Sequence, residues 1–343
     1  TSVTTTGYGI IVSRTSSTRY DSRGIHPISS SNALGHTETY EHNDPWGNRT
    51  KLTGPNGLST AWLYDGFGRL YRETRADGTR SSTGYAWCDS SCPSLENGRK
   101  LSYKKTNKST GSAASISYFD AVNRVLLTEK EGFDGKRIRS QTQYDSQGRV
   151  SWTSLPYQTT SPQYKQYNFY DNYNRLTSQR SPASGITRYQ YDGFLTTITN
   201  AKGQLHKEMK DALGRTVWTQ DPHAKKVSFN YDPQGNLIEV IPNSTASDAA
   251  KNKITHRYNL RGERIETNDP TMGLWRYSYN ALGRLTQQTD AKGQSSYLRY
   301  DILGRMTRRT QAERTTTCSY DISSNAIGKL SRVTQAGGYI KAI

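Results

Sequence analysis

The sequence is poor in the residues that build a large apolar core. Only 32% of its 343 residues are aliphatic, aromatic, Met or Cys, and 29 are Gly. Globular domains are usually about 45–50% apolar when Gly is counted with that set. The chain also has no apolar run of about 18 residues, the length that a membrane-spanning helix needs. We therefore expect neither one thick hydrophobic core nor a membrane span.

Cysteine is almost absent. Cys88, Cys92 and Cys318 are too few for a disulfide framework and for a four-cysteine zinc site. The sequence leaves three alternatives open for Cys88 and Cys92, which are four residues apart: a local disulfide, two unpaired thiols, or half of a metal site. The third cysteine is expected in a strand.

Motifs of known catalytic chemistry are missing as well. There is no G-x-S-x-G, P-loop or dinucleotide fingerprint, and the six histidines show no H-E-x-x-H spacing. The sequence therefore predicts that the chain is not an enzyme, with no catalytic residue, no metal site and no cofactor.

Charge is present mainly in one sign. The 46 Lys and Arg outnumber the 29 Asp and Glu, which gives a net charge of +17. Basic surfaces with interleaved aromatic rings are typical of single-strand nucleic-acid binders. However, arginine recurs at one position of a repeat and no long basic run occurs. We expect a structural role for these arginines and no specific nucleic-acid partner, while a basic face that contacts an acidic cargo or partner stays an alternative.

Tyrosine, in contrast, is abundant at 24 copies, and many copies begin the motif Tyr-Asp-x-x-Gly-Arg-apolar. Tyr258, Tyr279 and Tyr300 are each 21 residues apart, and a fixed period of this length indicates a repeat architecture. Weaker copies begin at Asn43 and Tyr320. The motif residues of the five copies singled out here are Tyr64, Asp65, Gly68, Arg69, Tyr144, Asp145, Gly148, Arg149, Tyr170, Asp171, Arg175, Tyr279, Gly283, Arg284, Tyr300, Asp301, Gly304 and Arg305.

Each repeat reads as two short strands and two tight turns. Asp-x-x-Gly is a turn signal, because Asp accepts hydrogen bonds from its own backbone and Gly tolerates positive φ. The segments between the turns are rich in Thr, Tyr and Val, which favour strands. The Asp is expected to cap its turn, and the Arg to bond carboxylates or carbonyls and to cover Tyr rings. Helices should be few, since no segment shows a 3.6-residue apolar period.

The repeats together predict an all-β fold. About thirteen repeats would give more than twenty strands, and a sheet of that size twists, curls or closes. We expect one repeat domain over residues 1–343, built of antiparallel β-hairpins that form a curled, spiralling sheet. Two polar segments, about 85–117 and 242–253, interrupt the repeat and are predicted to be loops.

The repeat resembles the YD or Rhs repeat, and the resemblance covers essentially the whole chain. The order of segments between Tyr85 and Tyr191 is similar to that of bacterial toxin-type Rhs proteins with SpvB-like and toxin-complex B-like segments upstream. That order is carried by 85–93 (YAWCDSSCP), 119–125 (FDAVNRV), 131–135 (EGFDG) and 144–150 (YDSQGRV). Repeats of this family in toxin-complex B and C subunits, polymorphic toxins and teneurins form a hollow β-shell. The resemblance thus implies that this chain is part of such a shell.

The resemblance also implies a function. In bacterial toxins the shell encloses a C-terminal toxic domain, so the chain would be a secreted, non-catalytic shell segment. Its partners would be its own C-terminal toxin domain, the remainder of the parent protein or other toxin-complex subunits. The family's aspartate-bearing self-cleavage segment is not found here, so no catalytic residue is assigned. A YD-repeat adhesion scaffold that binds glycan or protein at a cell surface is the alternative.

The two ends of the sequence carry no targeting signal. Thr1-Ser2-Val3-Thr4 has no initiator Met and no charged-then-apolar leader, and the C-terminus follows a repeat directly. An internal piece of a longer polypeptide is therefore expected.

Overall fold

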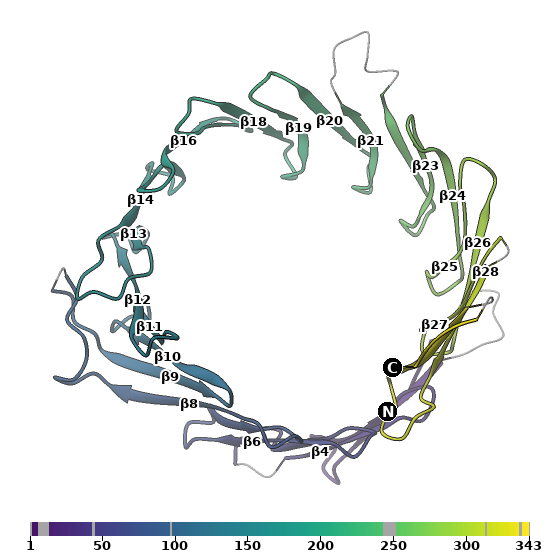
Figure 1. Ribbon diagram of the computed structural model, residues 1–343, viewed down its shortest axis with the longest axis horizontal. Coiled ribbons are helices and arrows are strands. Elements are labelled where there is room, and N and C mark those ends of the chain that lie inside the picture. The colour runs from purple at the N-terminus through teal and green to yellow at the C-terminus, as the bar shows by residue number, and fades with distance from the viewer. Residues whose placement is uncertain are drawn as a thin grey trace. The chain divides into compact units, whose positions relative to one another are not determined.

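The computed structural model describes residues 2–5, 14–42, 45–96, 98–242, 252–312, 314–335 and 338–342. Within these ranges the chain forms thirty β-strands and no helix, so the prediction of an all-β fold is confirmed (Figure 1). No helix of the described part is long and apolar enough to cross a membrane. By their contacts the residues divide into two compact units, Thr1–Ser59 with Thr216–Ile343, and Thr60–Arg215.

The first unit contains two runs of strands. In each run every strand pairs antiparallel with the next strand along the chain. The strands are β1 (Ser2–Thr5), β2 (Arg14–Tyr20), β3 (Pro27–Ser31), β4 (Thr37–Glu41) and β5 (Lys51–Thr53), then β19 (Thr216–Gln220), β20 (Lys226–Tyr231), β21 (Leu237–Pro242), β22 (Ile254–Tyr258), β23 (Arg264–Asp269), β24 (Gly273–Tyr279), β25 (Leu285–Thr289), β26 (Ser295–Tyr300), β27 (Met306–Gln311), β28 (Arg314–Tyr320), β29 (Leu330–Gln335) and β30 (Tyr339–Ala342).

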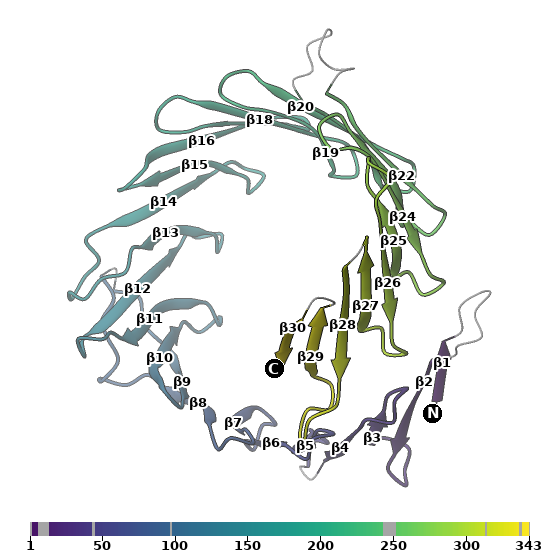
Figure 2. The same ribbon diagram turned by 45° about the vertical axis from the view of Figure 1, so that its right-hand side comes forward.

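The second unit is one run of antiparallel neighbours, and its hairpins follow one another along a curved sheet (Figure 2). Its strands are β6 (Ser59–Tyr64), β7 (Leu70–Thr74), β8 (Arg80–Trp87), β9 (Tyr103–Ser109), β10 (Ser112–Phe119), β11 (Val125–Glu131), β12 (Arg137–Tyr144), β13 (Val150–Ser154), β14 (Lys165–Tyr170), β15 (Leu176–Ser181), β16 (Gly185–Asp192), β17 (Leu195–Thr199) and β18 (Leu205–Lys210).

In each unit this connectivity places one row of turns at either end of the strands, and we call each of these two rows an edge. Because neighbouring strands are antiparallel, successive turns lie at opposite ends of the strands. The Asp-x-x-Gly-Arg turns all fall on one edge, which we call the motif edge. In the second unit it carries turns 65–69, 120–124, 145–149, 171–175 and 211–215. The other edge, the return edge, carries the intervening turns, such as 75–79, 132–136 and 200–204.

The sheet is a thin layer with one small core. Among the described residues the buried hydrophobic side chains are Leu95, Tyr118, Leu126, Leu127 and Cys318. All except Cys318 pack together in the second unit, where β10 and β11 meet the irregular segment that follows β8. Most other strand residues are half-buried, as expected for a single sheet whose two faces are both accessible.

The prediction of a loop over 85–117 is wrong for most of its length. Residues 85–87, 103–109 and 112–117 lie in β8, β9 and β10, and among the described residues of this segment 88–96, 98–102 and the turn 110–111 lack a strand. The repeat pattern did not predict β9 and β10, because β9 carries no copy of the motif and β10 carries only the variant that begins at Phe119, its last residue. Of the second predicted loop, residues 243–251 lie outside the described residues, as do Asn43 and Asp44 of a weak repeat copy.

Candidate functional site

Each motif turn is closed by its own aspartate. In the copy at Tyr144, the Asp145 N–H donates to the Arg149 carbonyl at 2.8 Å. The Asp145 carboxylate accepts the N–H groups of Gln147 and Arg149, each at 2.9 Å. Gly148 adopts φ 80°, a conformation that costs an L side chain energy, and Asn174 at φ 64° replaces this glycine in the Tyr170 copy.

The motif arginine binds back onto the same aspartate. The Arg149 Nε donates to Asp145 Oδ2 at 2.7 Å. Burial raises the pKa of Asp145, but the guanidinium and the turn N–H groups outweigh it, so the pKa lies below its ordinary value. The same pair, four residues apart, recurs in the turns at Asp65–Arg69, Asp120–Arg124, Asp171–Arg175, Asp211–Arg215 and Asp301–Arg305.

The arginine also reaches the tyrosine of the next repeat. The Arg149 guanidinium lies 4.7 Å from the Tyr170 ring centroid, and that tyrosine donates its hydroxyl proton to the Val150 carbonyl at 2.9 Å. One repeat thus contacts both the ring and the hydroxyl group of the tyrosine in the next repeat. We call this pair of contacts the Tyr–Arg lock. Guanidinium–ring distances in other copies are Arg69–Tyr85 4.2 Å, Arg124–Tyr144 4.9 Å, Arg175–Tyr191 4.4 Å, Arg284–Tyr300 5.8 Å and Arg305–Tyr320 4.4 Å.

The copy at Tyr279 departs from the pattern. Asn280 replaces the aspartate, so Arg284 lacks a carboxylate in its own turn and instead donates to the Leu303 carbonyl at 3.3 Å. Asn280 still accepts the turn N–H of Arg284 at 3.0 Å, and Gly283 keeps φ 76°. The turn therefore survives without the ion pair.

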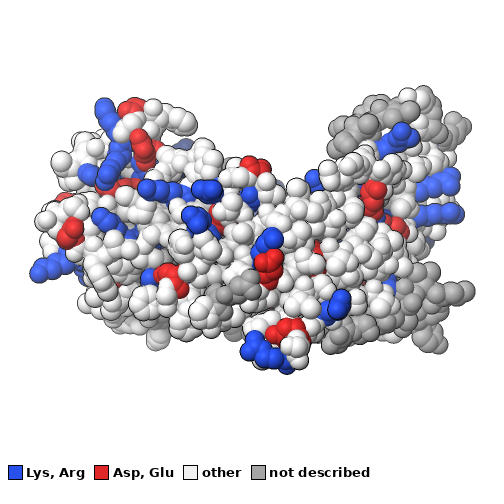
Figure 3. Space-filling model, turned by 90° about the horizontal axis from the view of Figure 1, so that it is seen from below, with Lys and Arg blue, Asp and Glu red and all other residues white. Residues whose placement is uncertain are grey.

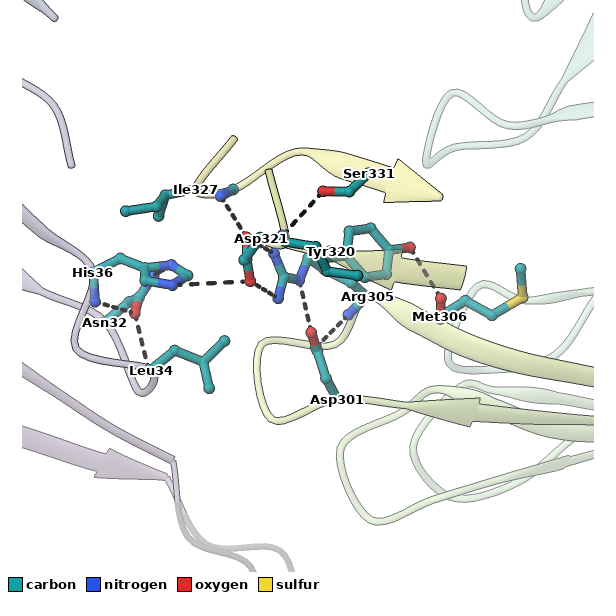
Figure 4. A network of polar contacts seen from close by, with 12 residues as sticks. Asn32, Leu34, His36, Asp301, Arg305, Met306, Tyr320, Asp321, Ile327 and Ser331 are labelled. Atoms are coloured by element: carbon teal, nitrogen blue, oxygen red, sulfur yellow. Dashed lines mark hydrogen bonds and ion pairs between the residues drawn. The ribbon is translucent and has the colours of Figure 1, made fainter. Parts of the chain in front are cut away.

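In the first unit, turns distant in sequence meet at a seam (Figure 4). Arg305 binds Asp321 through two hydrogen bonds, at 2.9 and 2.6 Å, and also binds Asp301 at 2.7 Å. The His36 ring lies 3.9 Å from Asp321 on the other side. Because Arg305 donates to its carboxylate, the pKa of Asp321 falls to about 2.

Two further contacts complete the seam. The Asn56 amide donates to the Ile327 carbonyl at 2.9 Å and accepts the Ile327 N–H at 2.8 Å. Arg14 donates to the Leu303 carbonyl at 3.2 Å. Sequence reasoning missed the seam, because the copies at Tyr320 and Ser31 are weak, with His36 in place of the arginine in the latter, and because Asn56 lies outside the motif.

A buried carboxylate in the second unit also escaped sequence reasoning. Glu129 is 2% exposed and accepts hydrogen bonds from Tyr118 at 2.9 Å, Arg137 at 2.8 Å and Arg139 at 2.7 Å. Burial, reinforced by the bond to Glu129, raises the pKa of Tyr118 to about 12. Glu129 lies in strand β11 outside any motif, so only the folded sheet reveals its three donors. This network ties the small core to β12.

Cys88 and Cys92 form a disulfide, with their Cα atoms 5.6 Å apart. Of the three alternatives that the sequence left open, the disulfide is the one present. Both cysteines pack against the small core. Among the described residues no group of three or more His, Cys, Asp or Glu side chains is arranged to hold a metal ion.

The break in the repeat after β8 leaves an aromatic cleft of about 370 Å³. Phe67, Arg69, Tyr85, Trp87 and Tyr103 line it, and the Phe67 and Trp87 side chains are 79% and 81% exposed. The Tyr103 ring packs edge-on against the Trp87 ring. The Phe119 ring stacks on the Tyr103 ring, with the two ring centroids 4.6 Å apart. Exposed rings of this kind can stack on a flat apolar face of a ligand.

The positive charge is spread rather than gathered. Six motif arginines are paired with aspartates in their own turns. On the face shown in Figure 3, basic side chains are interspersed with acidic ones. On that face the described residues do not form the kind of continuous basic groove that tracks a nucleic-acid backbone.

The fold and its repeated turn define the class: an all-β protein built of Tyr-Asp repeats. The family model described as RHS Repeat matches residues 20–58, 44–80, 170–205 and 274–316. The chain therefore contains Rhs repeats, as the motif predicted.

Curated relatives share part of this repeat region. The tRNA nuclease WapA of Bacillus subtilis (strain 168) is 33% identical over 120 residues. The match covers 32% of this chain and 5% of that protein. The tRNA(Glu)-specific nuclease WapA of Bacillus subtilis subsp. natto (strain BEST195) matches to the same extent. The chain thus spans about 5% of the length of these relatives.

Solved structures share the fold over nearly the whole chain. The crystal structure of TcdB2-TccC3 without its hypervariable C-terminal region matches 93% of this chain with a TM-score of 0.74 at 12% identity. That of TcdB2-TccC3-Cdc42 matches 93% with a TM-score of 0.72 at 13% identity. In each case the match covers 23% of the solved chain. This similarity confirms the Rhs-type β-fold that the repeat predicted.

The Tyr–Arg lock gives a first prediction. Tyr300→Phe removes the hydroxyl that donates to the Leu285 carbonyl at 2.8 Å, and it should lower the free energy of unfolding by about 1 kcal/mol in urea titrations. Tyr173→Phe is the matched control, because the Tyr173 side chain is 80% exposed on a turn; its effect should stay within about 0.5 kcal/mol. Equal losses in the two variants would contradict the lock.

The seam gives a second prediction, on pH. The folded pKa of Asp321 is about 2, below its ordinary value of 3.8, so its ionised form stabilises the fold above about pH 4. This contribution is lost as the pH falls from about 4 towards 2. The difference in unfolding free energy between the wild type and Asp321→Asn should therefore shrink over that range. A difference that does not change with pH would show that Asp321 has no such role.

Proposed function

We propose that the chain is a non-catalytic wall segment of an Rhs-type toxin shell, which encloses a toxin cargo carried on the same longer polypeptide. The fold shared with TcdB2-TccC3 supports this proposal. The match covers only 23% of those solved chains. We therefore propose, as parts of the same hypothesis, that the shell closes, that it holds a cargo, that the protein is secreted and that other toxin-complex subunits bind it.

The observation that carries the proposal is the thinness of the sheet. Strands such as β17 and β25 are half-buried along their whole length and consist largely of Thr, Gln and Leu. A sheet with a polar face can lie against a cargo without the strong hydrophobic adhesion that an apolar face would cause. A wall of this kind holds its cargo by many weak contacts and by excluding other molecules.

The Tyr–Arg lock suits this mechanical role. The lock recurs between successive repeats. The stability of the wall therefore comes from many contacts between neighbouring repeats and not from one hydrophobic core. Exclusion of solvent and proteases from a cargo needs a continuous barrier and no catalytic group. The proposed mechanism is therefore containment.

A cell-surface recognition scaffold is the second candidate, and the aromatic cleft is the observation that favours it. Phe67 and Trp87 present apolar ring faces beside Arg69, an arrangement that could stack on a sugar ring. Glycan-array binding that Trp87→Ala removes would favour this scaffold over containment.

Limited proteolysis of the full-length protein that contains this chain tests containment. We expect a C-terminal piece that resists protease, stays bound in native mass measurements and separates only on denaturation. A chemically unfolded sample is the control, since the same piece should then be digested. Immediate digestion of the C-terminus in the native protein would contradict the proposal.

A further inference from the structure

The connection between β8 and β9 is the longest one between the strands of the second unit. It runs over residues 88–102, which we call the connecting segment, whereas a motif turn such as 145–149 is only five residues long. None of its described residues lies in a strand. Connections longer than about 12 residues without a strand or helix of their own are uncommon in compact domains and are often functional.

The Cys88–Cys92 disulfide lies at the start of the connecting segment, where solvent reaches it. Both cysteines are half-buried, and they line an open cleft of about 350 Å³. Among the described residues that line this cleft, Arg99 and Lys100 outnumber the single acidic residue, Asp89. Positive charge stabilises thiolates, both in an attacking thiol and in the cysteine that leaves. A dissolved thiol can therefore attack this disulfide.

The disulfide also holds the connecting segment against the small core. Leu95 is 7% exposed and packs with Leu126 and Leu127, which are almost fully buried. Cys88 and Cys92 pack against the same cluster. Release of Leu95 would therefore uncover the apolar face of this core.

Backbone hydrogen bonds fix the ends of the connecting segment to the sheet. The Cys88 N–H donates to the Ser102 carbonyl at 2.9 Å, and the Ser102 N–H donates to the Phe119 carbonyl of β10 at 2.7 Å. These bonds continue the strand pairing of β8, β9 and β10, so they do not need the disulfide.

The middle of the connecting segment is bound by weaker contacts. Lys165 of β14 binds the Glu96 carboxylate at 2.6 Å, but the Glu96 side chain is 44% exposed, and exposed ion pairs contribute little stability. Arg99 donates to the Tyr144 carbonyl at 3.2 Å. The covalent ring at Cys88 and Cys92 is consequently the strongest restraint on residues between the two ends.

We propose that the Cys88–Cys92 disulfide is a redox latch: a small thiol opens it and releases the connecting segment from the small core, while the repeats on either side stay folded. Two thiols R–SH reduce the disulfide and leave joined as R–S–S–R, and each cysteine gains one of their protons. The neighbouring Tyr–Arg locks, at Tyr85 and Tyr144, use no cysteine and should survive. The latch does not depend on the cargo proposed above.

Hydrogen exchange of the full-length protein, with and without dithiothreitol as the thiol, tests this latch. Amide exchange in residues 88–102 should become at least about tenfold faster on reduction, because the closed ring no longer restricts the segment. Exchange in β14–β18 should stay within about twofold of its rate without reductant. Alkylation under the same native conditions, followed by peptide mapping, should label Cys88 and Cys92 and leave the buried Cys318 unlabelled.

Two variants serve as controls. The double variant Cys88→Ser, Cys92→Ser should show the fast exchange in residues 88–102 without reductant and should not respond to it. Cys318→Ala keeps the disulfide and should respond as the wild type does. Three results would each overturn the proposal: a disulfide that resists reduction in the native protein, reduction without faster exchange in residues 88–102, or exchange that rises equally over the whole second unit.

Discussion

The contact on which the rest of the structure depends is the one between a motif arginine and the tyrosine of the following repeat. The arginine is held by the aspartate of its own turn, which positions its guanidinium beside the next tyrosine. It then covers the next tyrosine ring while the strand beside it accepts the hydroxyl, as Arg149 and Val150 do for Tyr170. The turn, the sheet and the link between repeats therefore use the same few side chains.

Because the same few side chains serve all three purposes, a chain with so few buried apolar residues can form a long sheet. The small core around Leu126 and Leu127 includes residues of the irregular segment between β8 and β9, and it lies next to the disulfide and the buried Glu129. Elsewhere the lock replaces a core, and both faces of the sheet stay accessible. The lock joins neighbouring repeats along the sheet, while the seam joins turns that are distant in sequence within the first unit. Arg305 takes part in both, because it covers the Tyr320 ring and binds Asp321.

The sequence predicted what is local and periodic. The turn, the strand alternation and the covering of tyrosine rings follow from residue types at fixed spacing, and they recur wherever the motif is intact. Features without a period were missed. Strand β9 carries no Tyr-Asp motif, Glu129 draws its donors from β10 and β12, and His36 meets Asp321 only through the folded first unit. Contacts between residues so far apart depend on how the sheet bends, which a single sequence does not encode in any local pattern.

Hydrogen exchange in Arg149→Gln tests the central role of the lock most directly. The substitution removes the bond to Asp145 and the cover on Tyr170, while leaving the strand pairing unchanged. The account predicts faster amide exchange in β12–β15 and wild-type exchange in β17 and β18, because each repeat is stabilised by its neighbours. Exchange that stays at the wild-type rate throughout, or that rises equally over the whole second unit, would contradict it.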